Sequence, residues 1–185
     1  MTIMTNINRR SFLKTSAGAA TSLGLIGAGG KALAADDTIR IASLLDLSGG
    51  LDALGKPMQD AITFAVEEIN AAGGLLGKQI ELVTYDTQSD MRLYPQYAQQ
   101  SVMKDKVAAA FGGITSASRE VMRPVFRRLN TLYFYNTQYE GGVCDRNIFC
   151  TGITPAQKQS KHVPYAMNKW GKKIYTLAAD YNYGQ

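Results

Sequence analysis

The sequence predicts an α/β fold, a parallel β-sheet with helices on both faces, and three observations support this prediction. Short apolar runs alternate along the chain with longer segments whose apolar residues recur at helical spacing. Single helices separate successive strands, and such connections join parallel strands by right-handed crossovers. An apolar content of 45% is sufficient for a packed core.

The first predicted strand covers residues 38–45, TIRIASLL, and the following helix covers residues 56–74. From Ile62 onward the apolar residues of this helix fall at i, i+3, i+4 and i+7, which defines one buried face. Pro57 suits the first helical turn and Gly73 suits the C-terminal stop.

The alternation of strand and helix continues to residue 180. The next predicted elements are strand 79–86, helix 93–105, strand 106–111, helix 118–130 and strand 131–135. An irregular segment with both cysteines follows, and then helix 154–170 and strand 172–180. Pro164 is expected to kink or interrupt helix 154–170.

Residues 1–34 have the layout of a twin-arginine signal peptide. Paired arginines stand in NRRSFLK, residues 15–30 carry no charge, and Ala32 and Ala34 supply the small side chains that signal peptidase accepts. A transmembrane anchor is the alternative, but this uncharged stretch is shorter than the roughly 20 residues that span a bilayer. We therefore expect export to the periplasm by the twin-arginine translocase, followed by cleavage by signal peptidase.

The basic character of the chain belongs largely to this leader. The formal net charge is +5, and residues 1–34 contain four basic residues and no acidic one, so the remainder carries +1. Binding to nucleic acid or to a membrane surface therefore has no electrostatic support.

Two cysteines, Cys144 and Cys150, stand close together in VCDRNIFC. In an exported chain this spacing favours a disulfide, and two buried free thiols are the alternative. A metal site is not expected, because His162 is the only histidine and no second cysteine pair exists.

Ligands of parallel α/β sheets bind at the loops that leave the carboxyl ends of the strands. In the first such loop, GGLDALGKP resembles a phosphate-binding P-loop at Gly50, Gly55 and Lys56. Pro57 stands where that motif needs a Ser or Thr to bind magnesium, and it removes a backbone N–H. The sequence therefore does not support nucleotide hydrolysis, and no cofactor is expected.

Catalysis by a nucleophile has equally little support. Ser116 lacks the G-x-S-x-G elbow, and His162 has the character of a surface histidine on a helix. The adjacent carboxylates Glu67 and Glu68 point in different directions on their helix and are expected to be solvated. We therefore predict no catalytic residues.

A clamp for a small polar ligand is the remaining interpretation of the hydroxyl-rich turn in AAAFGGITSASRE. Thr115 and Ser116 offer hydroxyl and backbone groups, and one strand later FYNTQYEGG brings polar and aromatic side chains to the same edge of the sheet. The alternative is that the hydroxyls cap a helix and the tyrosines pack. We predict a ligand site that contains Tyr135, Thr137, Gln138 and Tyr139.

Three stretches, AVEEINAAGGLLGKQIELVTYDTQSD, FGGITSASREVMRPVFRRLN and YNTQYEGGVCDRNIFCTGITPAQ, resemble the type I periplasmic solute-binding proteins of ABC transporters. The similarity covers residues 38–185 and is closest to the branch that carries urea and short-chain amides, a relative of the branched-chain amino-acid binders. It implies two Rossmann-like lobes that close on a ligand. The first lobe would comprise residues 36–155, and residues 156–185 would begin the second.

By this resemblance, Thr115, Ser116 and Thr137 would hold polar ligand atoms and Tyr135 would form a wall. Tyr181 or Tyr183 would close over the ligand from the opposing lobe. The chain departs from the urea and amide branch at two positions expected to shape the pocket, where Ile114 replaces a common aromatic residue and Asn136 a common proline.

The expected function is that of an exported, non-enzymatic solute-binding protein. It would deliver urea, a short-chain amide or an amino acid to an ABC transporter permease. An amide- or urea-acting enzyme and a ligand-sensing receptor of the same fold are the alternatives. Since members of this family are about twice as long, the chain is expected to be a fragment with most of the first lobe.

Overall fold

The computed structural model of the protein describes residues 38–180 and 183–184. The predicted signal peptide 1–34 and the predicted site residue Tyr181 lie outside the described residues.

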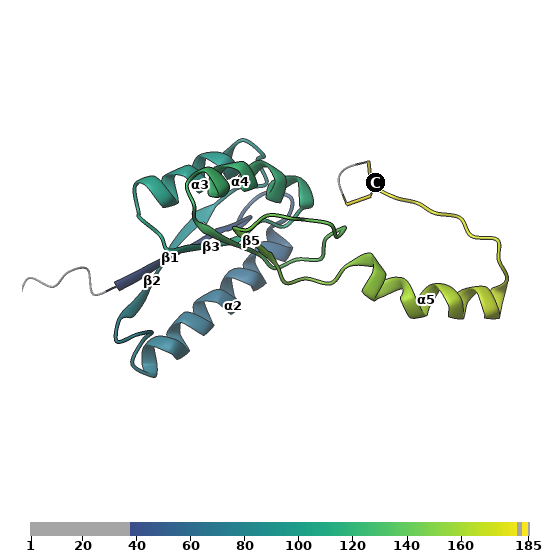
Figure 1. Ribbon diagram of the computed structural model, residues 1–185, viewed down its shortest axis with the longest axis horizontal. Helices are drawn as coiled ribbons and strands as arrows, with labels where there is room; N and C mark the ends of the chain where they lie inside the picture. The colour runs from purple at the N-terminus through teal and green to yellow at the C-terminus, as the bar shows by residue number, and fades with distance from the viewer. Residues whose placement is uncertain (1–37, 181–182, 185) are drawn as a thin grey trace, which may run out of the picture. The chain divides into compact units, whose positions relative to one another are not determined.

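The centre of the fold is a parallel sheet of five strands in the order β2-β1-β3-β4-β5 (Figure 1). All four pairings between neighbouring strands are parallel, which confirms the predicted α/β class. The strands are β1 (Thr38–Leu45), β2 (Gln79–Asp86), β3 (Ala109–Gly112), β4 (Leu132–Tyr135) and β5 (Ile148–Cys150).

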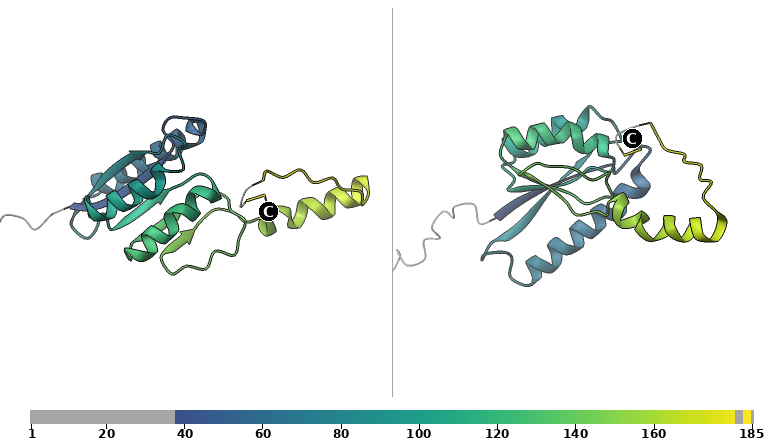
Figure 2. Two further views of the ribbon diagram at one scale, coloured as in Figure 1. Left: turned by 90° about the horizontal axis from the view of Figure 1, so that it is seen from above. Right: turned by 45° about the vertical axis from the view of Figure 1, so that its right-hand side comes forward.

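Helices cover the two faces of this sheet as predicted. Helix α2 (Asp52–Ala71) packs on one face against β1 and β2, whereas α3 (Leu93–Met103) and α4 (Ser116–Arg128) lie together on the other (Figures 1 and 2). Helix α5 (Pro155–Trp170) follows β5 and has no buried residue. Among the described residues, no helix has the combination of length and apolar character needed to cross a membrane.

The densest part of the core lies between the sheet and the α3–α4 layer. Its side chains come from the buried faces of both helices and from the strand positions that point toward them. Those exposed by no more than 1% are Ala42, Leu44, Tyr94, Ala98, Ala110, Met122, Phe126, Tyr133 and Tyr135. Burial of aromatic side chains of this size is the main contribution to the stability of such a layer.

Helix α2 begins earlier than its sequence predicted. Because it starts at Asp52, Pro57 lies inside the helix rather than in its first turn, and Lys56 lies in the helix and pairs with Asp52 at 2.6 Å. This geometry is unlike a phosphate-binding loop. The predicted stop is confirmed, since Gly73, just past the C-cap, has φ +104°, a left-handed conformation that favours glycine. Helix α5 continues past Pro164, so of the kink or interruption expected at this residue, the interruption does not occur.

Two strand predictions in the C-terminal part of the chain were wrong. The segment predicted to be irregular contains β5, which pairs with β4, and residues 172–180 form no strand. A strand needs a neighbouring strand to pair with, and among the described residues no strand is paired with segment 172–180. Its side chains are accordingly exposed, 90% for Tyr175 and 87% for Leu177.

The two cysteines are free thiols in the structure, contrary to the predicted disulfide. Cys144 is exposed in the loop that precedes β5, and Cys150 is half-buried at the end of that strand. The pairing of β5 with β4 places Cys150 opposite Tyr135 in the sheet, whereas Cys144 precedes the strand.

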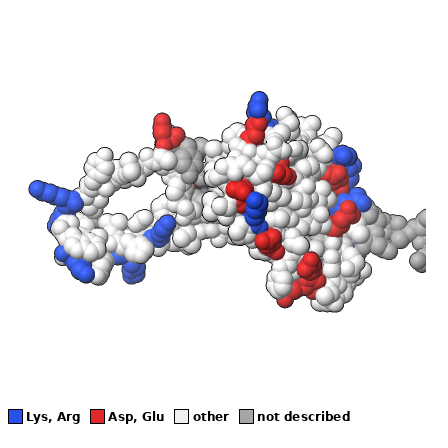
Figure 3. Space-filling view, turned by 180° about the vertical axis from the view of Figure 1, so that it is seen from behind, with Lys and Arg blue, Asp and Glu red and all other residues white. Residues whose placement is uncertain are grey.

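Charged side chains of both signs are interspersed on the surface that Figure 3 shows. Helix α5 differs from this pattern, because it carries Lys158, Lys161 and Lys169 and no acidic residue. His162 of the same helix is exposed, in agreement with its interpretation as a surface histidine.

Candidate functional site

A cavity of about 180 Å³ opens at the carboxyl-terminal edge of the sheet. Its wall comes from the start of α2, the connection between β3 and α4, the end of β4 with the following loop, and the C-terminal segment. The lining residues are Leu51, Leu54, Ile114, Thr115, Ser116, Tyr135, Gln138 and Tyr183. Six of them, all except the two leucines, belong to the ligand site that the sequence predicted.

Gly112 allows the connection between β3 and α4 to approach β1. Its φ is +138°, and a Cβ atom there would lie 2.1 Å from the carbonyl oxygen of Leu44. Any larger residue would push β3 away from β1 at this edge. The glycine therefore sets the position of the turn that begins at Ile114.

Two predicted site residues do not line this cavity. Thr137 donates its hydroxyl to the carbonyl oxygen of Ile114 at 3.0 Å and borders a different groove, on the α2 side of the sheet. Tyr139 packs instead near Arg119, whose guanidinium lies 5.7 Å from the centre of its ring. The structure thus places Thr137 and Tyr139 around the site, outside its lining.

Thr115 caps helix α4, which was the structural alternative to ligand binding. Its Oγ1 accepts a hydrogen bond from the Ser118 backbone N–H at 3.0 Å, and Ser118 Oγ accepts one from the Thr115 backbone N–H at 3.2 Å. Such a capping box satisfies donors that a helix start leaves without an acceptor. The Thr115 side chain therefore has a structural role at the rim of the cavity.

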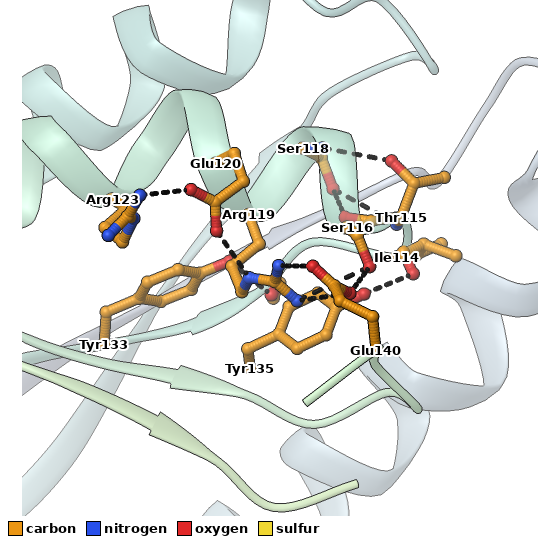
Figure 4. A network of polar contacts seen from close by, with 11 residues as sticks. Ile114, Thr115, Ser116, Ser118, Arg119, Glu120, Arg123, Tyr133, Tyr135 and Glu140 are labelled. Carbon is orange, nitrogen blue, oxygen red and sulfur yellow. Dashed lines mark hydrogen bonds and ion pairs between the residues drawn. The ribbon is translucent and has the colours of Figure 1, made fainter. Parts of the chain in front are cut away.

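Ser116 makes a contact that periodicity could not predict. It is 1% exposed, and its Oγ donates to Glu140 Oε2 at 2.6 Å (Figure 4). Glu140 belongs to the loop after β4, so this bond ties that loop to the start of α4. Gln138 of the same loop accepts from Lys158 Nζ at 3.4 Å, which connects the loop to α5.

A fully buried arginine, Arg119, organises the layer behind the cavity (Figure 4). Its guanidinium donates to both Glu140 and Glu120, with 3.0 Å between Arg119 Nε and Glu120 Oε1. The Tyr135 ring lies 5.0 Å from the same guanidinium, within the range of a cation–π contact. A buried charge needs this many partners to offset its loss of hydration.

Neither Arg119 nor Glu140 was among the site residues that the sequence predicted. The adjacent arginine and glutamate in TSASRE were visible, but residues at i and i+1 on a helix point in different directions. One sequence feature could have indicated a role for Arg119: it follows a run of hydroxyl residues and lies on the buried face of α4. Its partner, however, lies 21 residues further along, in a loop without periodicity.

The electrostatics of this layer keep its groups in defined protonation states. Burial acts to raise the pKa of Glu140, but hydrogen bonds from Arg119 and Ser116 outweigh it and hold that pKa below its usual value. Burial raises the pKa of Tyr135, which therefore stays protonated and donates its hydroxyl to the Ile114 carbonyl oxygen at 2.9 Å. Glu140 is thus a carboxylate, and the Tyr135 hydroxyl is occupied.

A second, mostly apolar cavity of about 390 Å³ adjoins the first and shares Leu51 and Thr115 with it. Its wall is supported by Asp46, which is fully buried and accepts hydrogen bonds from Thr87, Ser89 and Tyr94. The sequence did not indicate this cavity, because its lining comes from three separate connections and from the starts of α3 and α4.

The lining of the first cavity contains no Asp, Glu, Lys, Arg or His. In the part of the chain that the structure describes, no three His, Cys, Asp or Glu side chains form a group that could hold a metal ion. The lining combines an apolar wall with hydroxyl oxygens and one amide side chain, and it includes Ser116, the first residue of α4. Such a lining suits an uncharged solute or one whose charges cancel.

Comparison with known proteins identifies the family of this chain. The periplasmic binding protein domain family matches residues 39–185. The Leu/Ile/Val-binding protein homolog 7 of Brucella abortus (strain 2308) is 30% identical over 129 residues, which are 70% of this chain and 32% of that protein. The Leucine-, isoleucine-, valine-, threonine-, and alanine-binding protein of Pseudomonas aeruginosa is 32% identical over 92 residues, 50% of this chain and 24% of that one.

Solved structures show the same fold. The branched-chain amino acid transporter substrate binding protein LivJ of Streptococcus pneumoniae, in complex with isoleucine, is 27% identical with a TM-score of 0.62, over 71% of this chain and 38% of that one. A periplasmic binding protein of Burkholderia mallei has a TM-score of 0.71 at 23% identity, over 80% of this chain and 40% of that one, and shows the fold alone.

The chain spans about a third of the length of the Brucella relative and about two fifths of these solved chains. The region that matches the family, residues 39–185, nevertheless includes β2 to β5, all of β1 except Thr38, and all of the residues that line the cavity. From the match over residues 39–185, the chain belongs to the periplasmic binding protein domain family.

Proposed function

We propose that this protein captures a small polar solute in the periplasm and delivers it to an ABC transporter permease. The observation that carries the proposal is the uncharged cavity at the carboxyl-terminal edge of the sheet, where six predicted site residues meet. The names of the relatives, which describe amino-acid-binding proteins, support the same activity.

The solute that fits this cavity is small and has no net charge. Urea, short-chain amides and zwitterionic amino acids share this property and carry both hydrogen-bond donors and acceptors. The neighbouring apolar cavity offers room for an aliphatic side chain next to the polar cavity, which favours the amino acids.

The hydrogen bonding of Ser116 supports binding of a solute without its hydrolysis. Its hydroxyl donates to Glu140, a carboxylate whose lowered pKa makes it a weak base. A serine nucleophile needs a base that removes its proton near neutral pH, such as a histidine. The closest contacts of Ser116 therefore favour a binding role over amide or urea hydrolysis.

Two further parts of the proposal concern the rest of the protein. Residues 1–34 would direct export through the twin-arginine translocase and would be removed by signal peptidase. Residues 36–155 would form most of one lobe and residues 156–185 would begin a second, with Tyr183 approaching the solute from that side. Solute binding would then bring the two lobes together.

The test of solute binding is a thermal-shift and calorimetric screen of the mature protein against urea, acetamide, formamide, leucine, isoleucine and valine. A solute that binds only the folded state raises Tm with its concentration relative to Kd. Ser116→Ala should weaken the binding of any solute found. Ser160→Ala, on exposed α5, is the matched control and should leave it unchanged. Hydrolysis of urea or an amide would contradict the proposal.

The test of export is a fusion of residues 1–40 to a reporter that is active only in the periplasm after folding in the cytoplasm. Arg9→Lys together with Arg10→Lys should abolish its export, since the twin-arginine pathway reads this pair. The control is Lys14→Arg, which keeps the charge of the segment. Equal export of the reporter from all three fusions would contradict a twin-arginine signal.

A further inference from the structure

Three side chains behind the cavity, Ser116, Arg119 and Glu140, form a closed set of hydrogen bonds (Figure 4). Ser116 Oγ lies 2.6 Å from Glu140 Oε2 and 3.4 Å from Arg119 Nη1. Arg119 Nη1 in turn lies 3.4 Å from Glu140 Oε2, and Arg119 Nη2 donates to Glu140 Oε1. Of the three residues, Ser116 is the one that lines the cavity.

The chemistry of the two charged partners determines the direction of each bond. An ionised carboxylate can only accept and a guanidinium can only donate. The single proton of the Ser116 hydroxyl is therefore used by Glu140, and one of its two lone pairs faces Arg119. The Tyr135 hydroxyl also lies near Ser116, but it gives its proton to the Ile114 carbonyl oxygen. One acceptor position therefore remains on Ser116 Oγ, and no donor.

The surroundings prevent this arrangement from reversing. Arg119 is fully buried, its Nε–H donates to Glu120, and the Tyr135 ring lies beside its guanidinium. If Ser116, which is 1% exposed, donated to a solute instead, Glu140 would lose its hydrogen bond from Ser116, and this loss costs free energy.

Resting on the solute-binding function proposed above, we propose that Arg119 and Glu140 are a positioning pair that makes Ser116 a hydrogen-bond acceptor toward the cavity. The group of the solute that meets Ser116 Oγ is then an N–H or O–H donor. A carbonyl or carboxylate oxygen of the same solute meets the N–H groups at the start of α4, where the helix dipole favours negative charge. The pair thus selects solutes with an unsubstituted amide, urea or ammonium group.

The bond between Ser116 and Glu140 is tested without a solute, by NMR titration of carboxyl-labelled glutamate in the mature protein. Ser116→Ala removes a donor to Glu140 and should move the titration of that carboxyl to higher pH. Ser160→Ala, which changes a serine on exposed α5, should leave it unchanged. An unchanged Glu140 titration in Ser116→Ala overturns the inference, whether or not a solute has been identified.

Selection of a donor is tested with paired probes by calorimetry. Acetamide and urea carry N–H groups, and N,N-dimethylacetamide and tetramethylurea are their counterparts without one. The wild-type protein should prefer the N–H member of each pair by about tenfold or more, the usual worth of one hydrogen bond. Because a preference due to methyl bulk would persist in Ser116→Ala, that variant should lose most of the preference.

Two matched variants distinguish the positioning of Ser116 by Glu140 from the mere loss of a carboxylate beside Arg119. Glu140→Gln changes the partner that holds the Ser116 proton and should reduce the preference about tenfold. Glu120→Gln removes a carboxylate from the same guanidinium without touching Ser116, and it should keep the wild-type ratio. Equal ratios in the two variants overturn the inference but leave solute binding intact. Failure of every solute in the screen overturns solute binding, and the titration then still decides the state of Ser116.

Discussion

The two faces of the β4–β5 half of the sheet differ in how they are covered. Tyr133 and Tyr135 point into the α3–α4 layer and are fully buried, whereas Leu132 and Phe149 on the opposite face are 41% and 47% exposed. On that second face the rings of Phe134 and Phe149 stack at 5.2 Å, but α2 packs mainly against β1 and β2. A groove of about 810 Å³ runs beside α2 there.

The sequence of a strand therefore does not show which face of the sheet will be covered by helices. It also does not show which face will border the site and contribute more to stability. Both faces of β4 present large apolar side chains, as expected for a strand in a parallel sheet. The covered face gains the burial energy and also the dry surroundings in which the bonds of Arg119 are strong. The following predictions compare the two faces, from the largest effect to the smallest.

The largest expected effect is on the free energy of unfolding when Tyr133 is truncated. Tyr133→Ala empties a fully buried position and removes the hydrogen bond from its hydroxyl to the Gly112 carbonyl oxygen, so it should cost about 3–5 kcal/mol. Phe149→Ala, on the half-open face, should cost about 1 kcal/mol. Urea denaturation measures both, and similar losses would show that the faces do not differ.

Removal of the buried charge should have the next largest effect. Arg119→Met leaves Glu140 and Glu120 without their shared partner and should cost about 3 kcal/mol in the same urea experiment. Arg92→Met is the control, because Arg92 is 85% exposed in its pair with Asp90 and such pairs contribute about 0–1 kcal/mol. An Arg119→Met protein as stable as Arg92→Met would contradict a structural role of the buried pair.

Low pH should reduce the stability of the folded protein, in part because Glu140 on the covered face becomes protonated. Its pKa is lower in the folded protein than in the unfolded chain, so its stabilising effect is complete above the unfolded value and is lost as pH falls through the folded value. Tm measured from pH 6 down to pH 3 should therefore fall less steeply in Glu140→Gln than in the wild type. Parallel curves for the two proteins would contradict this contribution.

The smallest expected effect is a difference between the two thiols in their rates of chemical modification. Cys144 is exposed in a loop, whereas Cys150 packs against the covered core, where burial raises the pKa of its thiol. A thiol reagent at pH 8 should therefore modify Cys144 first and Cys150 more slowly. Detection of no free thiol in the denatured, unreduced protein would instead support the disulfide that the sequence predicted.

Much of the fold could be predicted from the sequence. The predicted first and second strands match β1 and β2 residue for residue, and α3 and α4 were predicted to within two residues at each end. Local periodicity reflects burial of one side of an element, and this property is written in neighbouring residues. The convergence of Ile114, Ser116 and Tyr135 followed from the rule that parallel strands end at one edge.

Local sequence patterns were enough to predict the α/β class, the order of most elements and the edge at which the cavity forms, because these depend on residues within a few turns of chain. The pairing of β5 with β4, the absence of a strand at residues 172–180 and the hydrogen bond that turns Thr137 from the cavity follow from the folded chain. It also brought Glu140 to Arg119 and Ser116. Such contacts join residues far apart in sequence, and their energy comes from burial and pairing that no local pattern records.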